Sequence, residues 1–401
     1  MEKTSLNRLP RNVWVVTITS FLTDISSEMV LNLVPLFLAN VLGTKTAIIG
    51  LIEGIAETTA SLLKLYSGWL SDKLGKRKWL TVLGYGLSTI AKPFLYIANT
   101  WVGVLGVRFA DRVGKGIRTA PRDALIAGSI DERQRGLAFG LHRAGDTAGA
   151  FVGLLIAAII IWLTQSASAS LTRTTFQIVV LISIIPATLA VIVLALGARE
   201  ITTARQSSDT PQLRLRGLEK RFKWFLLAVT LFTLGNSSDA FIILRGQERG
   251  LSVLQVMAML MTFTLIYSLL SGPLGALSDR IGRRKLILGG WAAYGLVYLG
   301  FALSKTGWQV WALFGLYGIY YAAVEGNAKA LIADLVPDDQ RGTAYGLYNA
   351  AVGLMTLPAS VVAGILWQGV FGWSGFGASA PFFFGAVLAL AASILFWQKV
   401  R

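Results

Sequence analysis

The chain has 401 residues, of which 54% are hydrophobic and only 14% charged, well below the roughly 25% charged residues of a typical soluble domain. This composition, with a mean hydropathy of +0.61, indicates a membrane protein. Cysteine is absent and His142 is the only histidine, which excludes disulfides, a thiol nucleophile and a Cys or His metal site. We therefore expect no cofactor, no metal and no enzymatic activity.

Twelve apolar segments follow one another along the chain, each long enough to cross roughly 30 Å of hydrocarbon as a helix of about 20 residues. They cover residues 13–38, 46–70, 79–98, 100–128, 138–163, 175–197, 223–245, 253–277, 286–304, 308–333, 342–366 and 378–398. The first segment is too long for a signal-peptide core and has no small-residue cleavage site, so we expect it to remain as a helix. The sequence therefore predicts an all-α membrane protein with twelve transmembrane helices.

Basic side chains gather in alternate loops between these segments and give the chain its net charge of +16. The loops on one side hold most of the Lys and Arg residues, including Lys73, Lys76, Arg77, Lys78, Arg214, Arg216, Arg280 and Arg284. The opposite loops hold Lys45, Arg173, Arg249 and Lys305. By the positive-inside rule the first set and both termini face the cytoplasm. The charge therefore indicates a multi-pass protein of the cell membrane, inner or plasma, with the lipid bilayer rather than nucleic acid as its partner.

The two halves of the chain repeat one another. The loop after the second segment reads GWLSDKLGKRK at 68–78, and the loop after the eighth reads GALSDRIGRRK at 275–285. In the same way, ALIA at 124–127 recurs at 330–333. Because six spans return a chain to the side on which it started, this pattern indicates duplication of a six-helix unit in one orientation.

We therefore expect two pseudo-symmetric six-helix bundles. The N-terminal bundle covers residues 1–198 and the C-terminal bundle residues 223–401. The polar and basic segment 199–222 between them is expected to be a cytoplasmic linker.

The repeated loop carries a family resemblance. With Gly68, Asp72, Gly75, Arg77 and Lys78 in place, the first copy is similar to the best-known signature of the major facilitator superfamily, and the second copy is nearly complete. The resemblance covers essentially the whole chain. It implies a secondary transporter with a central cavity between two halves and alternating access, and it does not name a substrate.

Residues of the two loops are expected to form a conformational latch at the cytoplasmic interface, because an Asp can pair with a helix N-terminus or a nearby base in one conformation and lose that contact in another. The latch residues are Gly68, Asp72, Gly75, Arg77, Lys78, Asp279, Arg283 and Arg284. The alternative is that the basic residues only anchor the loops on the anionic cytoplasmic leaflet.

The fourth segment carries the charges Arg108, Asp111, Arg112, Lys115, Arg118 and Arg122. On a helix they fall within a sector of about 120°, and because charge facing lipid is costly, this stripe must face protein or water. Its basic excess favours an anionic or zwitterionic ligand. The expected substrate-binding residues are Arg108, Arg112, Lys115, Arg118 and Arg122 of this segment, and Glu325 and Lys329 of the tenth segment.

Carboxylates inside other segments are expected to carry coupled protons. These are Asp24, Glu28, Glu53, Glu57 and Asp239. Residue counts place those of the first two segments at the depth of the fourth segment's bases, which predicts an ion network joining the first, second and fourth helices. The alternative is that such pairs only fix the helix register.

Glycines in the fifth segment repeat every four residues, at Gly145, Gly149 and Gly153. Small residues at this spacing let two helix backbones approach closely, so we expect a packing face rather than a functional mark.

These features predict a monomeric, proton-coupled secondary transporter of a small organic solute. No phosphate-binding G-x-x-x-x-G-K-[ST] motif is present, so the energy is expected to come from an ion gradient. Two alternatives stay open: an efflux pump that exchanges a drug or metabolite for protons, and a carrier of lipid head groups.

Overall fold

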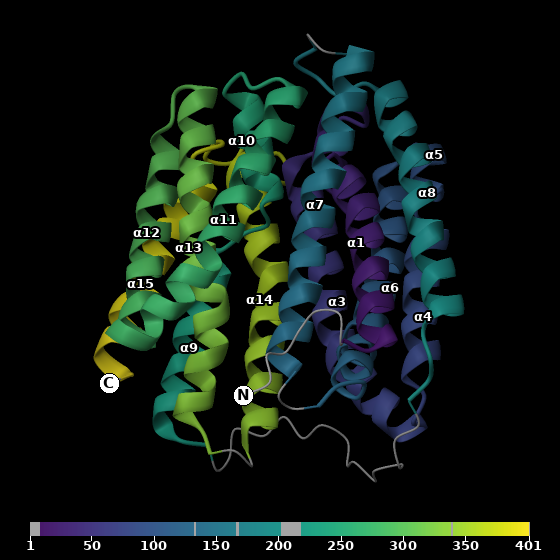
Figure 1. Cartoon of the computed structure of the whole chain (residues 1–401). Helices are drawn as coiled ribbons and strands as arrows, with labels where there is room; N and C mark the ends of the chain where they lie inside the picture. The colour runs from purple at the N-terminus through teal and green to yellow at the C-terminus, as the bar shows by residue number, and fades with distance from the viewer. Residues whose placement is uncertain (1–8, 132–133, 166–167, 202–217, 338–339, 401) are drawn as a thin grey trace. The chain divides into compact units, whose positions relative to one another are not determined.

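The computed structural model describes residues 9–131, 134–165, 168–201, 218–337 and 340–400. Its regular secondary structure in these ranges is helical (Figure 1). The helices form two compact units, each largely from one sequence half. Unit 1 comprises Met1–Val34, Thr59–Thr164 and Thr172–Pro211, and unit 2 comprises Pro35–Thr58, Gln165–Leu171 and Gln212–Arg401. The predicted boundaries of the bundles and linker stay a prediction, and most of the linker lies outside the described residues.

Unit 1 is built from long helices that pack side by side. They are α1 (Arg11–Leu31), the second half of α3 (Thr46–Leu74), α4 (Arg77–Ala91), α5 (Phe94–Ile97), α6 (Trp101–Ala127), α7 (Arg135–Gln165) and α8 (Arg173–Gly197). Its closest helix pairs are α4 with α6 and α1 with α8.

Unit 2 has the same construction. It contains the short helices α2 (Val34–Leu36) and η2 (Phe37–Val41) and the first half of α3. Its other helices are α9 (Lys220–Gly235), α10 (Ala240–Glu248), α11 (Val253–Ile281), α12 (Arg283–Leu303), α13 (Gly307–Leu335), α14 (Arg341–Gln368) and α15 (Ala380–Lys399). Here α13 packs against both α11 and α12, and α15 against α9 and α12 (Figure 1).

The described helices combine into the twelve predicted spans. Three spans are made of more than one helix: α1 with α2 and η2, α4 with α5, and α9 with α10. Pro93 stands at the α4–α5 break, where it cannot donate the amide hydrogen bond that would continue α4. At the α9–α10 break the polar run from Asn236 to Asp239 leaves the helix, and Asn236 adopts φ −97° and ψ 83°.

Within the described ranges, ten spans are long and apolar enough to cross a membrane by length and composition alone. The two remaining spans are α6 and α13, which begin at equivalent positions of the repeat, Trp101 and Gly307. Charged residues occur along α6, and α13 carries Glu325, Lys329 and Asp334 in its C-terminal part. All the substrate-binding residues predicted from the sequence lie on these two helices.

The predicted packing face on α7 is confirmed. A Cβ atom on Gly145 would meet the Thr17 side chain, and one on Gly149 would meet the backbone of Phe21 on α1. A Cβ atom on Gly153 would meet the backbone of Ile25, one turn further along α1. The three glycines therefore let α7 and α1 approach backbone to backbone.

Candidate functional site

The predicted basic stripe lies on α6, whose first turn is capped by Thr100: its hydroxyl accepts a hydrogen bond from the Gly103 amide at 3.2 Å. Four charged side chains of the stripe are buried, namely Arg108, Asp111, Arg112 and Arg118. Arg122 is half-buried and Lys115 is exposed. Burial against protein spares the four buried groups the cost of facing hydrocarbon.

Asp111 lies among the bases of this stripe. Its Oδ2 is 3.9 Å from Nε of Arg112, and it also interacts electrostatically with Arg118. Arg118 is held from α4: its Nη1 donates a hydrogen bond to Oγ of Ser88 at 2.7 Å, and its Cζ lies 4.4 Å from the centre of the Tyr85 ring. The ring face attracts the guanidinium, so α4 fixes where this charge points.

Lys92 is a buried base that the sequence prediction missed. It lies at the α4–α5 break, is 2% exposed, and donates hydrogen bonds to Oγ of Ser26 at 2.5 Å and Oγ of Ser27 at 3.2 Å on α1. It also interacts electrostatically with Asp111. A lysine inside the apolar third segment, directly before a proline, was the signal that could have found it.

Two of the predicted proton carriers, Asp24 and Glu28, lie on α1 beside this cluster. Asp24 interacts electrostatically with Glu28, with Lys115 and Arg118 of α6, and with Asp146 of α7. Asp146 was not among the predicted site residues. The structure thus brings together the α1 carboxylates and the α6 bases.

Arg122 ties α6 to α1 one turn beyond Arg118. Its Nη1 donates a hydrogen bond to Oγ of Ser20 at 3.2 Å, and its Nε donates to Asp123 at 3.0 Å. On α7, Oδ2 of Asp146 lies 3.8 Å from Nε2 of His142. The charged groups of unit 1 therefore span α1, α4, α6 and α7.

Glu53 and Glu57 lie in unit 2, on the first half of α3. Glu53 is buried and Glu57 half-buried. Glu57 interacts electrostatically with Asp239, which stands at the α9–α10 break. The structure therefore brings together two predicted proton carriers, Glu57 and Asp239. The predicted network between α3 and α6 stays a prediction.

Aromatic side chains surround the acidic groups of unit 2. Tyr317 donates a hydrogen bond from its hydroxyl to Oδ1 of Asp239 at 3.2 Å, and Tyr267 donates to Oε2 of Glu325 at 2.5 Å. Lys329, one turn after Glu325 on α13, is exposed. We call Asp239, Glu325 and the tyrosines that hydrogen-bond to them the acidic, aromatic wall of unit 2. The cluster of unit 1 has a basic excess instead.

An arginine of each copy of the loop motif, at motif positions that differ by one, makes the same contact in its own unit. Nη1 of Arg77 donates a hydrogen bond to the Ala124 carbonyl at 3.2 Å, and Nη1 of Arg283 donates to the Ala330 carbonyl at 2.9 Å. Both arginines thereby satisfy carbonyl groups near the C-terminal ends of α6 and α13. The side chain of Asp72 lies outside what the structure describes.

Glycines and carboxylates shape both loops further. Gly75 and Gly282 have φ values of +62° and +91°, a region that favours glycine. Glu200 caps α4 by accepting hydrogen bonds from the amides of Arg77 at 2.8 Å and Lys78 at 2.9 Å. Asp279 lies 3.7 Å from Arg283.

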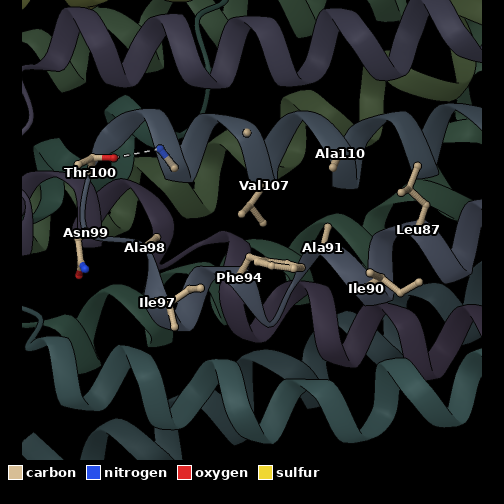
Figure 2. A pocket seen from close by; sticks show the side chains of 12 residues that line it. Leu87, Ile90, Ala91, Phe94, Ile97, Ala98, Asn99, Thr100, Val107 and Ala110 are labelled. Carbon is tan, nitrogen blue, oxygen red and sulfur yellow. Dashed lines mark hydrogen bonds between the residues drawn. The ribbon is translucent and has the colours of Figure 1, made fainter.

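An apolar cavity of about 550 Å³ lies between α4, α5 and α6 of unit 1, at the α4–α5 break (Figure 2). Its lining is Leu87, Ile90, Ala91, Phe94, Ile97, Ala98, Asn99, Thr100, Gly103, Gly106, Val107 and Ala110. Phe94, Ile90 and Ile97 have highly exposed side chains, as expected for a lipid-facing surface. None of the predicted site residues lines this cavity.

Twelve helical spans, a duplicated loop and charged groups held inside the spans define a multi-pass membrane transporter. A sequence model of the Major Facilitator Superfamily matches residues 16–244 and 224–401. The chain belongs to this superfamily, which confirms the resemblance carried by the repeated loop and the predicted fold.

Relatives support this membership over the full length. The chain is 37% identical, over 393 residues, to an uncharacterized MFS-type transporter of Methanocaldococcus jannaschii, covering 96% of this chain and 94% of the relative. It is 24% identical over 411 residues to the multidrug resistance protein MdtG of Proteus mirabilis, covering 98% and 97%.

Solved structures show the same fold at low sequence identity. A mutant of the nucleoside transporter NupG superposes with a TM-score of 0.80 at 14% identity, covering 97% of this chain and 100% of that one. A bacterial homolog of the human lysosomal transporter Spinster, in an inward-facing and occupied conformation, has a TM-score of 0.78 at 16% identity, covering 97% and 96%.

Proposed function

We propose that this chain is a proton-coupled secondary transporter that moves a small organic solute with a negative charge, an anion or a zwitterion, by alternating access. The observation that carries the proposal is the charged cluster of unit 1, in which Asp24 of α1 interacts electrostatically with Lys115 and Arg118 of α6, and Glu28 interacts with Lys92. Ionisable groups inside a membrane are costly, and they mark substrate and proton pathways by default.

The composition of the cluster favours an anionic group on the substrate. Its acidic side chains are Asp24, Glu28, Asp111, Asp123 and Asp146, and its basic side chains are Lys92, Arg108, Arg112, Lys115, Arg118 and Arg122. An excess of bases leaves positive potential that an anionic ligand can compensate. Arg118, fixed by Ser88 and Tyr85, is the base best positioned to hold such a ligand.

We attribute proton coupling to the electrostatic interactions of Asp24 with Lys115 and Arg118. A proton on Asp24 neutralises its charge, so Arg118 becomes a stronger site for an anion. Proton and anion then favour each other's binding, and the two move in the same direction. A cationic solute would instead compete with the proton and exchange with it.

The paired loop contacts fit a latch in this cycle. Arg77 and Arg283 hold equivalent carbonyl groups in units 1 and 2. We place these contacts among those that break and form during alternating access, in a monomer whose termini face the cytoplasm of a cell-membrane protein.

The second candidate is proton-coupled efflux of a drug or metabolite. It is favoured by the similarity to the multidrug resistance protein MdtG and by the acidic, aromatic wall of unit 2. The two candidates differ in the sign of coupling, so one experiment separates them.

The test uses the purified full chain in proteoliposomes with an imposed pH gradient and a panel of radiolabelled organic anions, zwitterions and cations. We expect uptake of an anion or zwitterion towards the alkaline side, and at least a tenfold loss of gradient-driven uptake in Asp24→Asn and Arg118→Ala. Lys305→Ala, an exposed outer-loop change, serves as the control. Cation movement opposite to the protons would establish efflux instead, and transport indifferent to the gradient for every solute would remove proton coupling.

A further inference from the structure

We infer that unit 2 binds the positively charged group of an organic solute, in a corner formed by Phe263, Tyr267 and Tyr321 with the carboxylate of Glu325. The inference rests on the proposed function, because it names the positive end of the transported solute. It thereby selects a zwitterion, or a solute with an amine, over a simple anion.

The three rings form two walls at right angles. Phe263 and Tyr267, one turn apart on α11, have nearly parallel rings, with an interplanar angle of 7° and centroids 6.2 Å apart. Tyr321 of α13 stands across them, at 90° to Phe263 and 83° to Tyr267, with centroids 5.5 and 6.2 Å away. A cation held within about 6 Å of such ring centres is attracted by their negative faces.

Glu325 supplies the formal charge of the site. It lies one turn after Tyr321 on α13, and its Oε2 accepts a hydrogen bond from the Tyr267 hydroxyl at 2.5 Å. The phenol thus fixes the carboxylate beside the rings. A carboxylate next to perpendicular aromatic faces is the arrangement that binds protonated and quaternary amines.

Exposure separates these residues from the aromatic core behind them. Phe263, Tyr267, Tyr321 and Glu325 are all half-exposed, so a solute can reach them. Tyr294, Tyr298 and Tyr317 are fully buried and form the packed interior. The accessible rings are the ones that stand next to the carboxylate.

A second acid strengthens the negative potential from behind. Tyr317, whose ring centre lies 5.2 Å from that of Tyr321, donates a hydrogen bond to Asp239 at 3.2 Å. Tyr321 itself interacts electrostatically with Asp239 and Glu325. Lys329 lies one turn beyond Glu325 and is exposed. A bound amine would therefore sit between the rings and the Glu325 carboxylate, in the negative potential of both acids.

The experiment measures binding of benzyltrimethylammonium to the purified full chain in detergent by isothermal titration calorimetry. Its neutral isostere, neopentylbenzene, is the ligand control. We expect the cation to bind at least tenfold more tightly than the isostere, and Glu325→Gln to weaken the cation at least tenfold. The matched control Glu219→Gln changes an exposed carboxylate at the start of α9 and should leave the affinity within twofold.

A second variant guards against misfolding. Tyr321→Leu keeps the carboxylate and removes one wall, and we expect it to weaken the cation about fivefold, in line with roughly 1 kcal/mol for a cation–π contact. Equal affinity for cation and isostere, or unchanged affinity in both Glu325→Gln and Tyr321→Leu, overturns the inference. If the chain binds the cation but its transport does not respond to a pH gradient, the binding site is supported and the proposed proton coupling is wrong.

Discussion

Lys92 is the residue that links the α4–α5 break to the charged cluster of unit 1. It is buried, hydrogen-bonded to two serines of α1, and close enough to Asp111 to interact electrostatically with it. A base in this position reduces the cost of burying Asp111, and Asp111 does the same for Lys92. The stability of each charge therefore depends on the other.

We predict that Lys92→Met lowers the free energy of unfolding by about 3 kcal/mol, since Ser26 and Ser27 lose a charged hydrogen-bond donor and buried Asp111 loses one of the bases that compensate it. The thermal unfolding midpoint in detergent checks this, with Lys45→Met, at an exposed outer position, as the control. Adding Asp111→Asn to Lys92→Met should restore part of the loss. A double variant that loses the full sum of both single effects would show that the two charges do not interact.

Single residues also show the limit of sequence reasoning. The stripe on α6 could be predicted because six charges with helical spacing form a pattern that must avoid lipid. Lys92 and Asp146 were missed because one charge in an apolar segment has no periodicity. Their meaning depends on which helices pack together, and the local sequence does not specify that.

At the scale of helices, glycine spacing decides how closely α7 and α1 approach. Gly149 has no room for a Cβ because the Phe21 backbone occupies that space, whereas a Cβ on Gly140 of the same helix would meet nothing within 4 Å. The two glycines thus have the same helix propensity but opposite packing environments.

We therefore expect opposite effects from one substitution. Gly149→Ala should destabilise the protein by about 1–3 kcal/mol through overpacking, while Gly140→Ala should be neutral or stabilise it by up to about 1 kcal/mol through helix propensity. Equilibrium unfolding in sodium dodecyl sulfate measures both. If both variants changed the free energy of unfolding in the same direction, the close approach of α7 and α1 would not control stability.

All twelve spans could be predicted from hydropathy and the repeat, but the helix breaks could not. Ser26-Ser27-Glu28 lies within the continuous helix α1, whereas its repeat counterpart Ser237-Ser238-Asp239 lies in the break between α9 and α10. Nearly identical residues thus adopt different backbones, because the choice depends on surrounding contacts such as the hydrogen bonds from Tyr317 to Asn236 and Asp239.

For the whole molecule, the repeat predicts the duplication, whereas the composition of a compact unit depends on contacts. Residues 35–58 and 165–171 belong to unit 2 although they precede the second repeat. The sequence repeat indicates that the two halves arose by duplication. The compact units are defined by contacts, so a unit can include segments from both sequence halves.

The predicted orientation can be tested because the natural chain has no cysteine. We expect a membrane-impermeant maleimide to label Lys305→Cys in intact cells and to leave Lys76→Cys unlabelled until the cells are permeabilised. Both positions are exposed, so access rather than burial decides the result. The reverse labelling would place the termini outside.

The polarity of α6 and α13 has a consequence for biosynthesis. Neither helix is as apolar as the other ten spans, so we expect each to enter the bilayer together with helices already made. For α6 these companions include α1 and α4, which hold its arginines, and for α13 they include α11, whose tyrosine holds Glu325. We therefore expect the fourth span of each repeat to be stable in the bilayer only when its neighbouring helices are present.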